Sequence, residues 1–365
     1  MSDPGPTGHP DVPDLRPEDY RPRPPPAEVI ERFPIGVAGC GSIMRGAHLP
    51  AYRSFGYRVL AACDVVEERA RLVAEQFGIP RYTTRLEDLL DDPQIKVIDL
   101  AVHASQRVPL VEQIAAAGKH LLSQKPFALT YEDARHMVEL CERAGVTLMI
   151  NQQARWAPAH RALKLIVESG VLGHLYSVLH VNRSFQDVPG SWYAALEHFN
   201  IVDHGIHYLD LSRYYTGLTP VRIKATTTRV PGQAAVSPMI YSILCEYAPP
   251  AQVMSTLHFN NIVPVRQALG RYEWLLDGTQ GAAVASQSEL AVAVKANPAR
   301  KHVFAIQGSW FPEAFGGSMG ELLTALAEGR APQTSGRDNL QSIKMALAAV
   351  ESSESGRAVE LDEIG

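Results

Sequence analysis

Cysteine is scarce in this chain of 365 residues, and its four cysteines are scattered over Cys40, Cys63, Cys141 and Cys245. None of them forms a Cys-x-x-Cys pair, so the sequence indicates neither a zinc site nor a disulfide framework. No stretch approaches the ~18 consecutive apolar residues that span a membrane. The start of the chain also lacks a basic segment followed by an apolar core, so we expect a cytoplasmic protein without a secretory signal or a membrane partner.

An excess of charge of one sign is also lacking. The 34 basic and 39 acidic residues give a net charge of only -5, and no dense Lys/Arg stripe of the kind that neutralises nucleic-acid phosphates is present. We therefore expect no nucleic-acid partner. What the chain does have is an ordinary globular composition, and its length predicts two domains.

Proline is concentrated at the beginning, where ten of the 26 prolines fall at or before Pro34. Because proline lacks an N–H and restricts the residue before it, we expect residues 1–33 to be an extended N-terminal segment without helices. The segment is interpreted as a loose tail or as an arm laid along a surface.

From Pro34 onward, short apolar runs alternate with amphipathic stretches. Strands are predicted over 35–39, 59–63, 97–102, 120–122 and 146–150, and helices over 67–77, 108–117 and 131–144. Gly118 and Gly145 stand where the last two helices should stop. This β-α-β order predicts a doubly wound parallel sheet, covered by helices on both faces, over residues 34–152.

The second half has a different rhythm, with predicted helices over 158–169 and 201–216 and a final one over 338–352. Strand-like segments occupy 221–230, 239–247, 253–259 and 272–277, and Pro249-Pro250 predicts a hairpin turn. We expect an α+β domain over residues 153–365 with a large open, mostly antiparallel sheet. The whole chain is therefore of the α/β class.

A glycine turn after the first strand carries the clearest chemical signal. Gly39 and Gly41 would let backbone N–H groups approach a pyrophosphate, although Met44 departs from the third glycine of the G-x-G-x-x-G pattern. Asp64 ends the next strand, where a carboxylate would accept hydrogen bonds from ribose hydroxyls and repel a 2'-phosphate. The prediction is a dinucleotide site for NAD rather than NADP, a preference that the nearby Arg69 would soften.

Two further constellations carry residues that handle protons. Lys125 follows the strand predicted at 120–122, at the carboxyl edge where ligands of parallel sheets bind. Farther along, Asp203, His207 and Asp210 form one polar stripe at i, i+4 and i+7 of a predicted helix. A solvated face would look similar, but Asp and His can hold and move a proton.

Other chemistries are less well supported by the residues. His204 and His207 with Asp203 do not match a familiar zinc spacing, so we predict no metal site. The chain also has no G-x-S-x-G elbow for a serine nucleophile.

Together these constellations resemble the glucose-fructose oxidoreductase and inositol dehydrogenase family, Gfo/Idh/MocA, over about residues 35–361. The matching parts are Gly39-Cys40-Gly41-Ser42-Ile43, Ala117-Gly118-Lys119-His120, Lys125-Pro126, Asn151 with Arg155-Trp156, and Asp203-x-Gly205-x-His207-x-x-Asp210. The resemblance implies a Rossmann domain followed by a sheet that mediates homodimers or homotetramers. It also implies sugar, cyclitol or related polyhydroxy substrates, and a catalytic group of Lys125, Asp203 and His207.

The chain departs from the family pattern at two places on the cofactor side. Gln124 replaces the glutamate before Lys-Pro, and Val102-His103-Ala104 replaces the common Thr-Pro-Asn. We assign Gln124 and His103 to the cofactor site together with the glycine turn, Ser42 and Ile43.

The predicted function is an NAD(P)-dependent dehydrogenase, with NAD favoured over NADP, that oxidises a secondary hydroxyl of a sugar, a sugar derivative or a cyclitol, or reduces the matching ketone. His207 would take the hydroxyl proton, Asp203 would orient it or bind a neighbouring hydroxyl, and Lys125 would stabilise alkoxide charge. Arg155, Trp156 and Trp192 are candidates for the substrate wall, with core or interface packing as the alternative role. A glycosidase-like reaction by transient oxidation and elimination, or a sensor without turnover, are the alternative functions.

Overall fold

The computed structural model describes residues 11–365, and it divides them into two compact units. The small-sheet unit contains residues 22–157, 309–347 and 364–365. The large-sheet unit contains residues 11–21, 158–308 and 348–363. The domain boundaries expected at residues 33 and 152 stay a prediction. The two compact units each combine several separate segments of the chain, whereas the predicted domains are continuous segments, so the two divisions cannot be compared directly.

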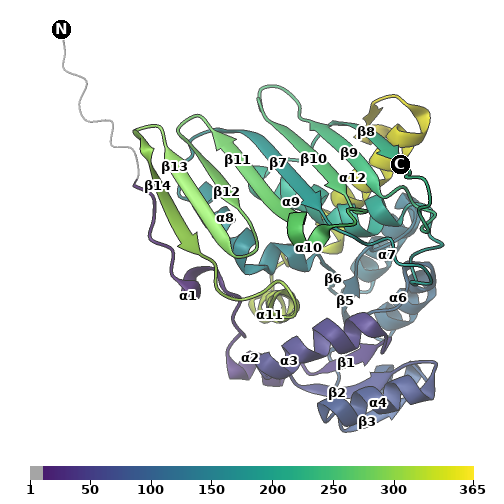
Figure 1. Cartoon of the computed structure of the whole chain (residues 1–365). Coiled ribbons are helices and arrows are strands. Elements are labelled where there is room, and N and C mark those ends of the chain that lie inside the picture. Colours follow the sequence, from purple (N-terminus) through teal and green to yellow (C-terminus); the bar gives the residue numbers. More distant parts are fainter. Residues whose placement is uncertain (1–10) are drawn as a thin grey trace. The chain divides into compact units, whose positions relative to one another are not determined.

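Six parallel strands form the small sheet in the order β3-β2-β1-β4-β5-β6 (Figure 1). They are β1 (Ile35–Ala38), β2 (Val59–Cys63), β3 (Arg81–Thr83), β4 (Val97–Leu100), β5 (His120–Gln124) and β6 (Leu148–Asn151). This is the strand order of dinucleotide-binding sheets, and its chain reversal lies between β1 and β4. β1, β4 and β6 are buried along their whole length, as expected of strands covered on both faces.

Helices connect these strands. They are α3 (Leu49–Phe55), α4 (Glu67–Phe77), α5 (Glu87–Leu90), α6 (Arg107–Ala116) and α7 (Tyr131–Arg143), with the short turns η1 (Met44–His48), η2 (Ala104–Gln106) and η3 (Gln153–Trp156). The Thr130 side chain accepts from Asp133 N–H at the start of α7. The predicted stops Gly118 and Gly145 are both left-handed, at φ 68°, which glycine adopts without steric cost.

The large sheet has nine strands in the order β14-β13-β12-β11-β7-β10-β9-β8-β15 (Figure 1). They are β7 (Leu175–Arg183), β8 (Arg222–Thr228), β9 (Ile240–Glu246), β10 (Met254–Asn260), β11 (Arg271–Gly278), β12 (Gly281–Ala285), β13 (Glu289–Val294), β14 (Asn297–Ala305) and β15 (Val359–Glu360). The pair β7 and β10 is parallel and the other pairs are antiparallel. The predicted fold class and the hairpin at Pro249-Pro250 are therefore confirmed.

Burial alternates along the strands of the large sheet, so that its two faces differ. In β7 from Val178 onward, and along β9 and β10, every second residue is buried and the residues between are half-buried or exposed. The helices of this unit are α8 (Pro158–Glu168), η4 (Phe199–Gly205), α9 (Ile206–Thr216) and the short α10 (Arg266–Leu269) and η5 (Leu361–Glu363). His180 of β7 contacts Tyr208 and Ser212 of α9, so the buried face is the one that the helices cover.

The expectation of a helix-free N-terminal segment is wrong within the described residues. Helix α1 covers Pro17–Tyr20, and α2 covers Ala27–Arg32. Pro17 opens α1, a position where the missing N–H has no partner to lose and the fixed φ suits a helix. The part of the predicted segment over residues 1–10 lies outside the described residues.

Two long helices lie near the end of the chain, α11 (Glu313–Glu328) and α12 (Gly336–Ser355). Three glycines of α11 let it approach its neighbours closely in the small-sheet unit. A Cβ at Gly316 would lie 2.8 Å from the Phe55 ring, and one at Gly317 would lie 2.9 Å from Cβ of Trp156. Helix α11 is therefore part of the core beside α3 and η3.

Candidate functional site

The glycine turn after β1 has the geometry that a dinucleotide needs. Gly39 is left-handed at φ 93°, and a Cβ there would lie 2.9 Å from the carbonyl carbon and oxygen of Ala101, so no other residue fits. At Gly41 no atom lies within 4 Å of the corresponding position, which leaves the backbone open to a ligand. Ser42 and Ile43 continue the turn into a helical segment, where Met44 is fully buried.

Asp64 lies directly after β2 and contacts the glycine turn. Its carboxylate accepts from Cys40 N–H at 2.8 Å and from Val66 N–H at 2.9 Å, and the residue is 8% exposed. A carboxylate has about four acceptor positions, so these two bonds leave room for ribose hydroxyls. Arg69 is exposed on the following helix α4. The glycine turn and Asp64 therefore fit the predicted dinucleotide.

Two of the remaining cofactor candidates follow β4 and end β5, at the same carboxyl edge of the sheet. His103 is exposed, and its Nδ1 lies 2.8 Å from Ser105 Oγ at the start of η2. Gln124 is 5% exposed, and its Oε1 accepts from Lys125 N–H at 2.8 Å. The amide that replaces the expected glutamate thus holds the backbone of the half-buried Lys125.

A buried polar network that the sequence analysis did not identify lies under this edge. Nδ1 of His48 is 2.7 Å from Oδ2 of Asp99, which also accepts from Tyr52 O–H at 2.7 Å. Nε2 of His48 lies 3.4 Å from the side-chain amide nitrogens of Gln124 and Asn151. Burial, with the charge of Asp99, raises the pKa of Tyr52 well above its ordinary value. The acid within the apolar run 97–102 was the one available signal for this network.

In the large-sheet unit, the predicted proton-handling stripe lies on a helix whose first part is a π-helix. Asp203 is half-buried in η4, and His207 in α9 is 7% exposed. Asp210 is fully buried, and its Oδ1 lies 3.8 Å from Nη1 of Arg213. Asp210 is therefore part of an ion pair in the interior.

Buried side chains fix the π-helical turn. Asn261 Nδ2 donates to Asn200 Oδ1 at 2.5 Å and lies 3.2 Å from Nδ1 of His204. Ser184 O–H donates to the other amide atom of Asn261, at 2.8 Å. Gly205 allows close packing here, since a Cβ would lie 2.9 Å from the Tyr241 hydroxyl. Sequence reasoning assigned no role to Asn200 or Asn261, because nothing in their spacing pairs them.

The three candidates for the substrate wall have different surroundings. Arg155 in η3 donates to Gln333 O at 3.3 Å and lies 3.5 Å from Asp338. Trp156 is 4% exposed and packs on α11, which favours the packing role left open for it. Trp192 is 59% exposed and meets the Phe199 ring edge-on at 5.6 Å, at the start of η4.

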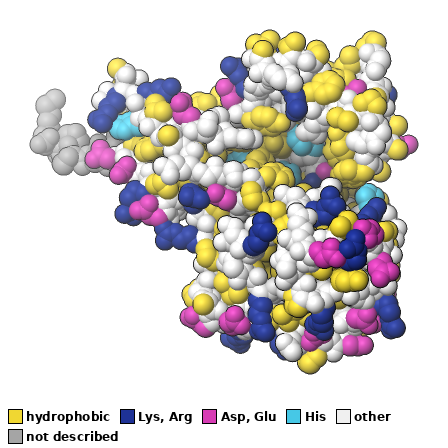
Figure 2. All heavy atoms as spheres, turned by 60° about the horizontal axis from the view of Figure 1, so that its bottom comes forward, with side chains coloured by type: hydrophobic (Ala, Val, Ile, Leu, Met, Phe, Trp, Pro, Cys, Tyr) yellow, Lys and Arg dark blue, Asp and Glu magenta, His cyan; other side chains and the backbone are white. Residues whose placement is uncertain are grey.

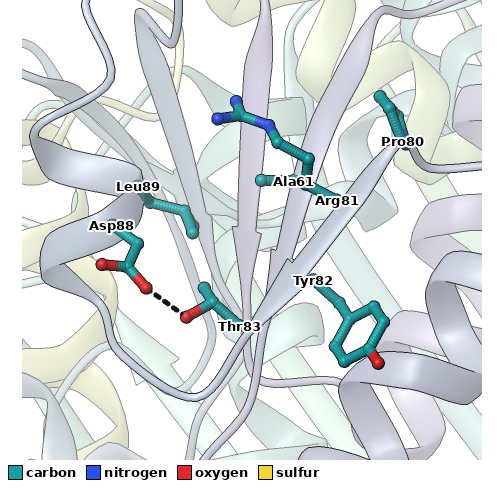
Figure 3. A pocket seen from close by; sticks show the side chains of 7 residues that line it. All are labelled: Ala61, Pro80, Arg81, Tyr82, Thr83, Asp88 and Leu89. Carbon is teal, nitrogen blue, oxygen red and sulfur yellow. Dashed lines mark hydrogen bonds between the residues drawn. The ribbon is translucent and has the colours of Figure 1, made fainter.

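A pocket of about 450 Å³ lies elsewhere, at the outer strand β3 of the small sheet (Figure 3). It is lined by Ala61, Pro80, Arg81, Tyr82, Thr83, Asp88 and Leu89. Thr83 donates to Asp88, as the dashed line shows, and Arg81 pairs with Asp92. The pocket shares no residue with the predicted sites, so we assign it no role.

Lys and Arg side chains lie interspersed with Asp and Glu on the face drawn in Figure 2. Within residues 11–365, no cluster of three or more His, Cys, Asp or Glu could hold a metal ion. Over the same residues, no helix is long and apolar enough to cross a membrane.

The chain is similar to known oxidoreductases over most of its length. Residues 33–152 match the model of an oxidoreductase family with an NAD-binding Rossmann fold, and residues 160–284 match the GFO/IDH/MocA C-terminal domain. D-apiose dehydrogenase from Paraburkholderia graminis is 32% identical over 92% of this chain and 91% of that protein. Myo-inositol 2-dehydrogenase from Thermotoga maritima is 28% identical over 50% and 54%, respectively.

A solved structure is similar over most of the chain. The oxidoreductase from Agrobacterium radiobacter, in complex with NAD+, L-tartaric acid and magnesium, superposes with a TM-score of 0.83 at 28% identity. The match covers 92% of this chain and 100% of that one.

Proposed function

Because the chain belongs to the Gfo/Idh/MocA oxidoreductase family, we propose that it is an NAD-dependent dehydrogenase of a sugar, a sugar derivative or a cyclitol. Membership confirms the resemblance seen in the sequence. The proposed reaction oxidises a secondary hydroxyl or reduces the matching ketone. The observation that carries the proposal is the glycine turn bonded to Asp64, in a chain similar to D-apiose dehydrogenase along nearly its full length.

The cofactor would be held by the main chain of the turn and by Asp64. The open backbone at Gly41, with Ser42 and Ile43 after it, would receive the pyrophosphate. The Asp64 carboxylate would accept from ribose hydroxyls and repel a 2'-phosphate, which favours NAD over NADP. His103 and Gln124 stay predictions for the nicotinamide side.

In the proposed mechanism, the nicotinamide supplies the hydride acceptor and the protein manages the proton. The His207 imidazole takes the proton of the substrate hydroxyl, and Asp203 orients it or binds a neighbouring hydroxyl. The Lys125 ammonium stabilises the alkoxide charge and, in reverse, polarises the carbonyl. This mechanism requires Lys125 and His207 to act on one substrate.

The substrate is proposed to be a small polyhydroxy compound. The exposed indole of Trp192 offers a flat apolar surface that suits the apolar face of a sugar ring. Arg155 would reach hydroxyls or a carboxylate. No nucleic acid or membrane takes part in this proposal, and the location stays a cytoplasmic prediction.

The partner of the large sheet is proposed to be a second copy of the chain, giving a homodimer or a homotetramer. Its open face carries the half-buried residues Leu179 of β7, Leu244 of β9 and Leu275 of β11, and Leu179 and Leu275 are directly paired. Thr256 of β10 lies between Leu179 and Leu244, and the paired Ser242 and His258 share this face. Apolar side chains among polar ones are common in interfaces between protein chains. Light scattering should show a dimer or larger for the wild type and a smaller species for Leu179→Arg, and a monomeric wild type contradicts the proposal.

The test of the proposed function is an assay of the purified protein with NAD and a panel of D-apiose, myo-inositol and levoglucosan. Reduced cofactor is followed by absorbance. We expect Lys125→Ala and His207→Ala each to lower kcat by about 100-fold to 10,000-fold. Two control variants should leave kcat unchanged. Lys96→Ala changes an exposed lysine in the unit of Lys125, and His174→Ala changes an exposed histidine in the unit of His207.

Three results would count against this assignment. Unchanged kcat in both site variants would exclude the proposed roles. Release of an aglycone without accumulation of reduced cofactor would identify elimination instead of net oxidation. Cofactor binding without turnover across the panel would favour a sensor.

A further inference from the structure

A buried arginine lies next to the lysine that is proposed to be catalytic. Arg107 is the first residue of α6 and is 2% exposed. Its Nε and Nη2 donate to Val102 O at 3.1 and 2.8 Å, and its Nη1 donates to Gln124 O and to Pro126 O. One guanidinium thus binds main-chain carbonyls of the loop after β4, of the last residue of β5 and of the loop that follows β5.

Two of these carbonyls belong to the residues on either side of Lys125. The Gln124 carbonyl is part of the peptide that enters Lys125, and the Pro126 carbonyl follows it. Lys125 N–H donates to Gln124 Oε1, so the main chain is held from a third direction. Because these bonds fix the peptide groups around Lys125, they fix the direction in which its Cα–Cβ bond points.

Arginine suits this position for a physical reason. Its planar guanidinium presents five N–H groups in a fixed fork, whereas lysine has three donors on one rotating nitrogen. Burying a cation is costly unless hydrogen bonds replace the lost water. The carbonyls supply those bonds only while the two loops keep their present geometry.

We propose that Arg107 is a positioning residue for Lys125, which locks the lysine loop to the loop carrying Val102 and His103. The inference rests on the proposed function, because Arg107 affects turnover only if Lys125 is catalytic. A misplacement of a reacting group by about 1 Å can cost about 100-fold in rate, so loss of this clamp should reduce turnover strongly.

The test compares Arg107→Met with Lys119→Met in the full-length protein. Lys119 is also a buried cation of the small-sheet unit, 8% exposed, and it donates to Asp92 O and Ile95 O. Those carbonyls precede β4, at the opposite end of the strands from Lys125. Both variants lose a buried cation bound to carbonyls, but only one loses it beside the lysine.

Two readouts are measured, hydrogen exchange of the peptide spanning residues 121–128 and kcat on the substrate found with the panel. For Arg107→Met we expect exchange in this peptide to rise about tenfold or more. We also expect kcat to fall about 100-fold, with a larger primary deuterium isotope effect because hydride transfer becomes rate-limiting. Lys119→Met should lower the melting temperature about as much as Arg107→Met does. It should nevertheless leave both readouts within about threefold of the wild type.

Arg107→Lys covers the case in which Arg107→Met does not fold. It keeps the charge but offers one donor nitrogen, so it should reproduce the rise in exchange and the fall in kcat. Equal effects of Arg107→Lys and Lys119→Met on both readouts would overturn the inference.

Failure of the proposed function is distinguishable from failure of the inference. If Lys125→Ala retains wild-type kcat, the proposed catalytic role of the lysine is wrong. The exchange measurement needs no turnover, so it still decides whether Arg107 holds the lysine loop. If Lys125→Ala is inactive and Arg107→Met keeps wild-type exchange and kcat, the inference alone is wrong.

Discussion

The candidate residues of the two units are held in different ways. In the small-sheet unit, main-chain groups hold Asp64 and the loop of Lys125, since Cys40 N–H donates to Asp64 and carbonyls beside Lys125 accept from Arg107. In the large-sheet unit, side chains hold one another, as Asn261 does with Asn200. A site built from loop backbone depends on conformation, whereas a site built from side-chain networks depends on the identity of each partner.

The largest effect is expected from a change in the glycine turn, whose function depends on its backbone conformation. Gly39→Ala places a Cβ against the Ala101 carbonyl at a left-handed φ, so we expect about 3 kcal/mol less stability toward urea. NADH binding, followed by fluorescence titration, should be lost as well.

Gly41→Ala is the matched control for this experiment. It meets no atom within 4 Å, so its stability should stay within about 0.5 kcal/mol of the wild type. Its NADH affinity should nevertheless fall, since the new methyl group would lie where the pyrophosphate approaches. Unchanged affinity would show that the cofactor does not approach this glycine.

A smaller effect is expected from the side-chain network. Asn261→Ala leaves Asn200 Oδ1 and the Ser184 hydroxyl without their buried partner, which should cost about 1 to 3 kcal/mol in thermal unfolding. Hydrogen exchange should rise in residues 199–207, which carry Asp203 and His207.

Asn260→Ala provides the comparison for this variant. Asn260 is the adjacent, half-buried residue, and its side chain accepts only locally, from Ile262 N–H at 3.2 Å. If both variants change exchange over 199–207 equally, the network does not position the turn.

The effect that is smallest at neutral pH concerns the core of the large-sheet unit, because it grows only as the pH falls. Burial lowers the pKa of His180 to about 3, and burial together with the charge of His180 lowers the pKa of His160. The folded protein therefore takes up fewer protons than the unfolded chain below about pH 6.5. Stability is complete above that pH and decreases as the pH falls toward 3, by up to about 1.4 kcal/mol per pH unit for each histidine.

His180→Asn should remove one of these two contributions. Unfolding in urea between pH 6.5 and 4.5 should show a shallower decrease in stability than for the wild type. His174→Asn, which replaces an exposed histidine of the same unit, should keep the wild-type slope. An unaltered slope in His180→Asn would mean that this imidazole is protonated in the folded protein.

The same contrast explains what the sequence could predict. The β-α-β order, the glycine turn and the position of Asp64 are local patterns, so they were readable along the chain. Strand β3 was missed because it has only three residues, none of them buried. Helix α11 was missed because Gly316, Gly317 and Gly320 argue against a helix, and their role in close packing is visible only with Phe55, Trp156 and Tyr57 in place.

The candidate site shows the same limit. Lys125, Asp203 and His207 were predicted from spacing and from the family resemblance, and they stay predictions. His48 and Asp99 are 51 residues apart in the chain, and Arg107 binds carbonyls of residues 17 and 19 positions away. Contacts of this kind depend on the order of the strands in the sheet. The hydrophobic periodicity of the sequence predicts where strands occur but not which strands are neighbours.

Asp64 has a consequence for protein engineering. Replacing the acid after the second strand is the obvious route to a variant that accepts a phosphorylated nucleotide. Here the same carboxylate also receives Cys40 N–H and Val66 N–H, so a shortened side chain would free two amides of neighbouring turns. Asparagine would retain only one of the two acceptor oxygens, and its NH2 group would face the other backbone amide. A successful redesign would therefore keep the carboxylate or supply a second acceptor, and introduce the positive charge at a separate position.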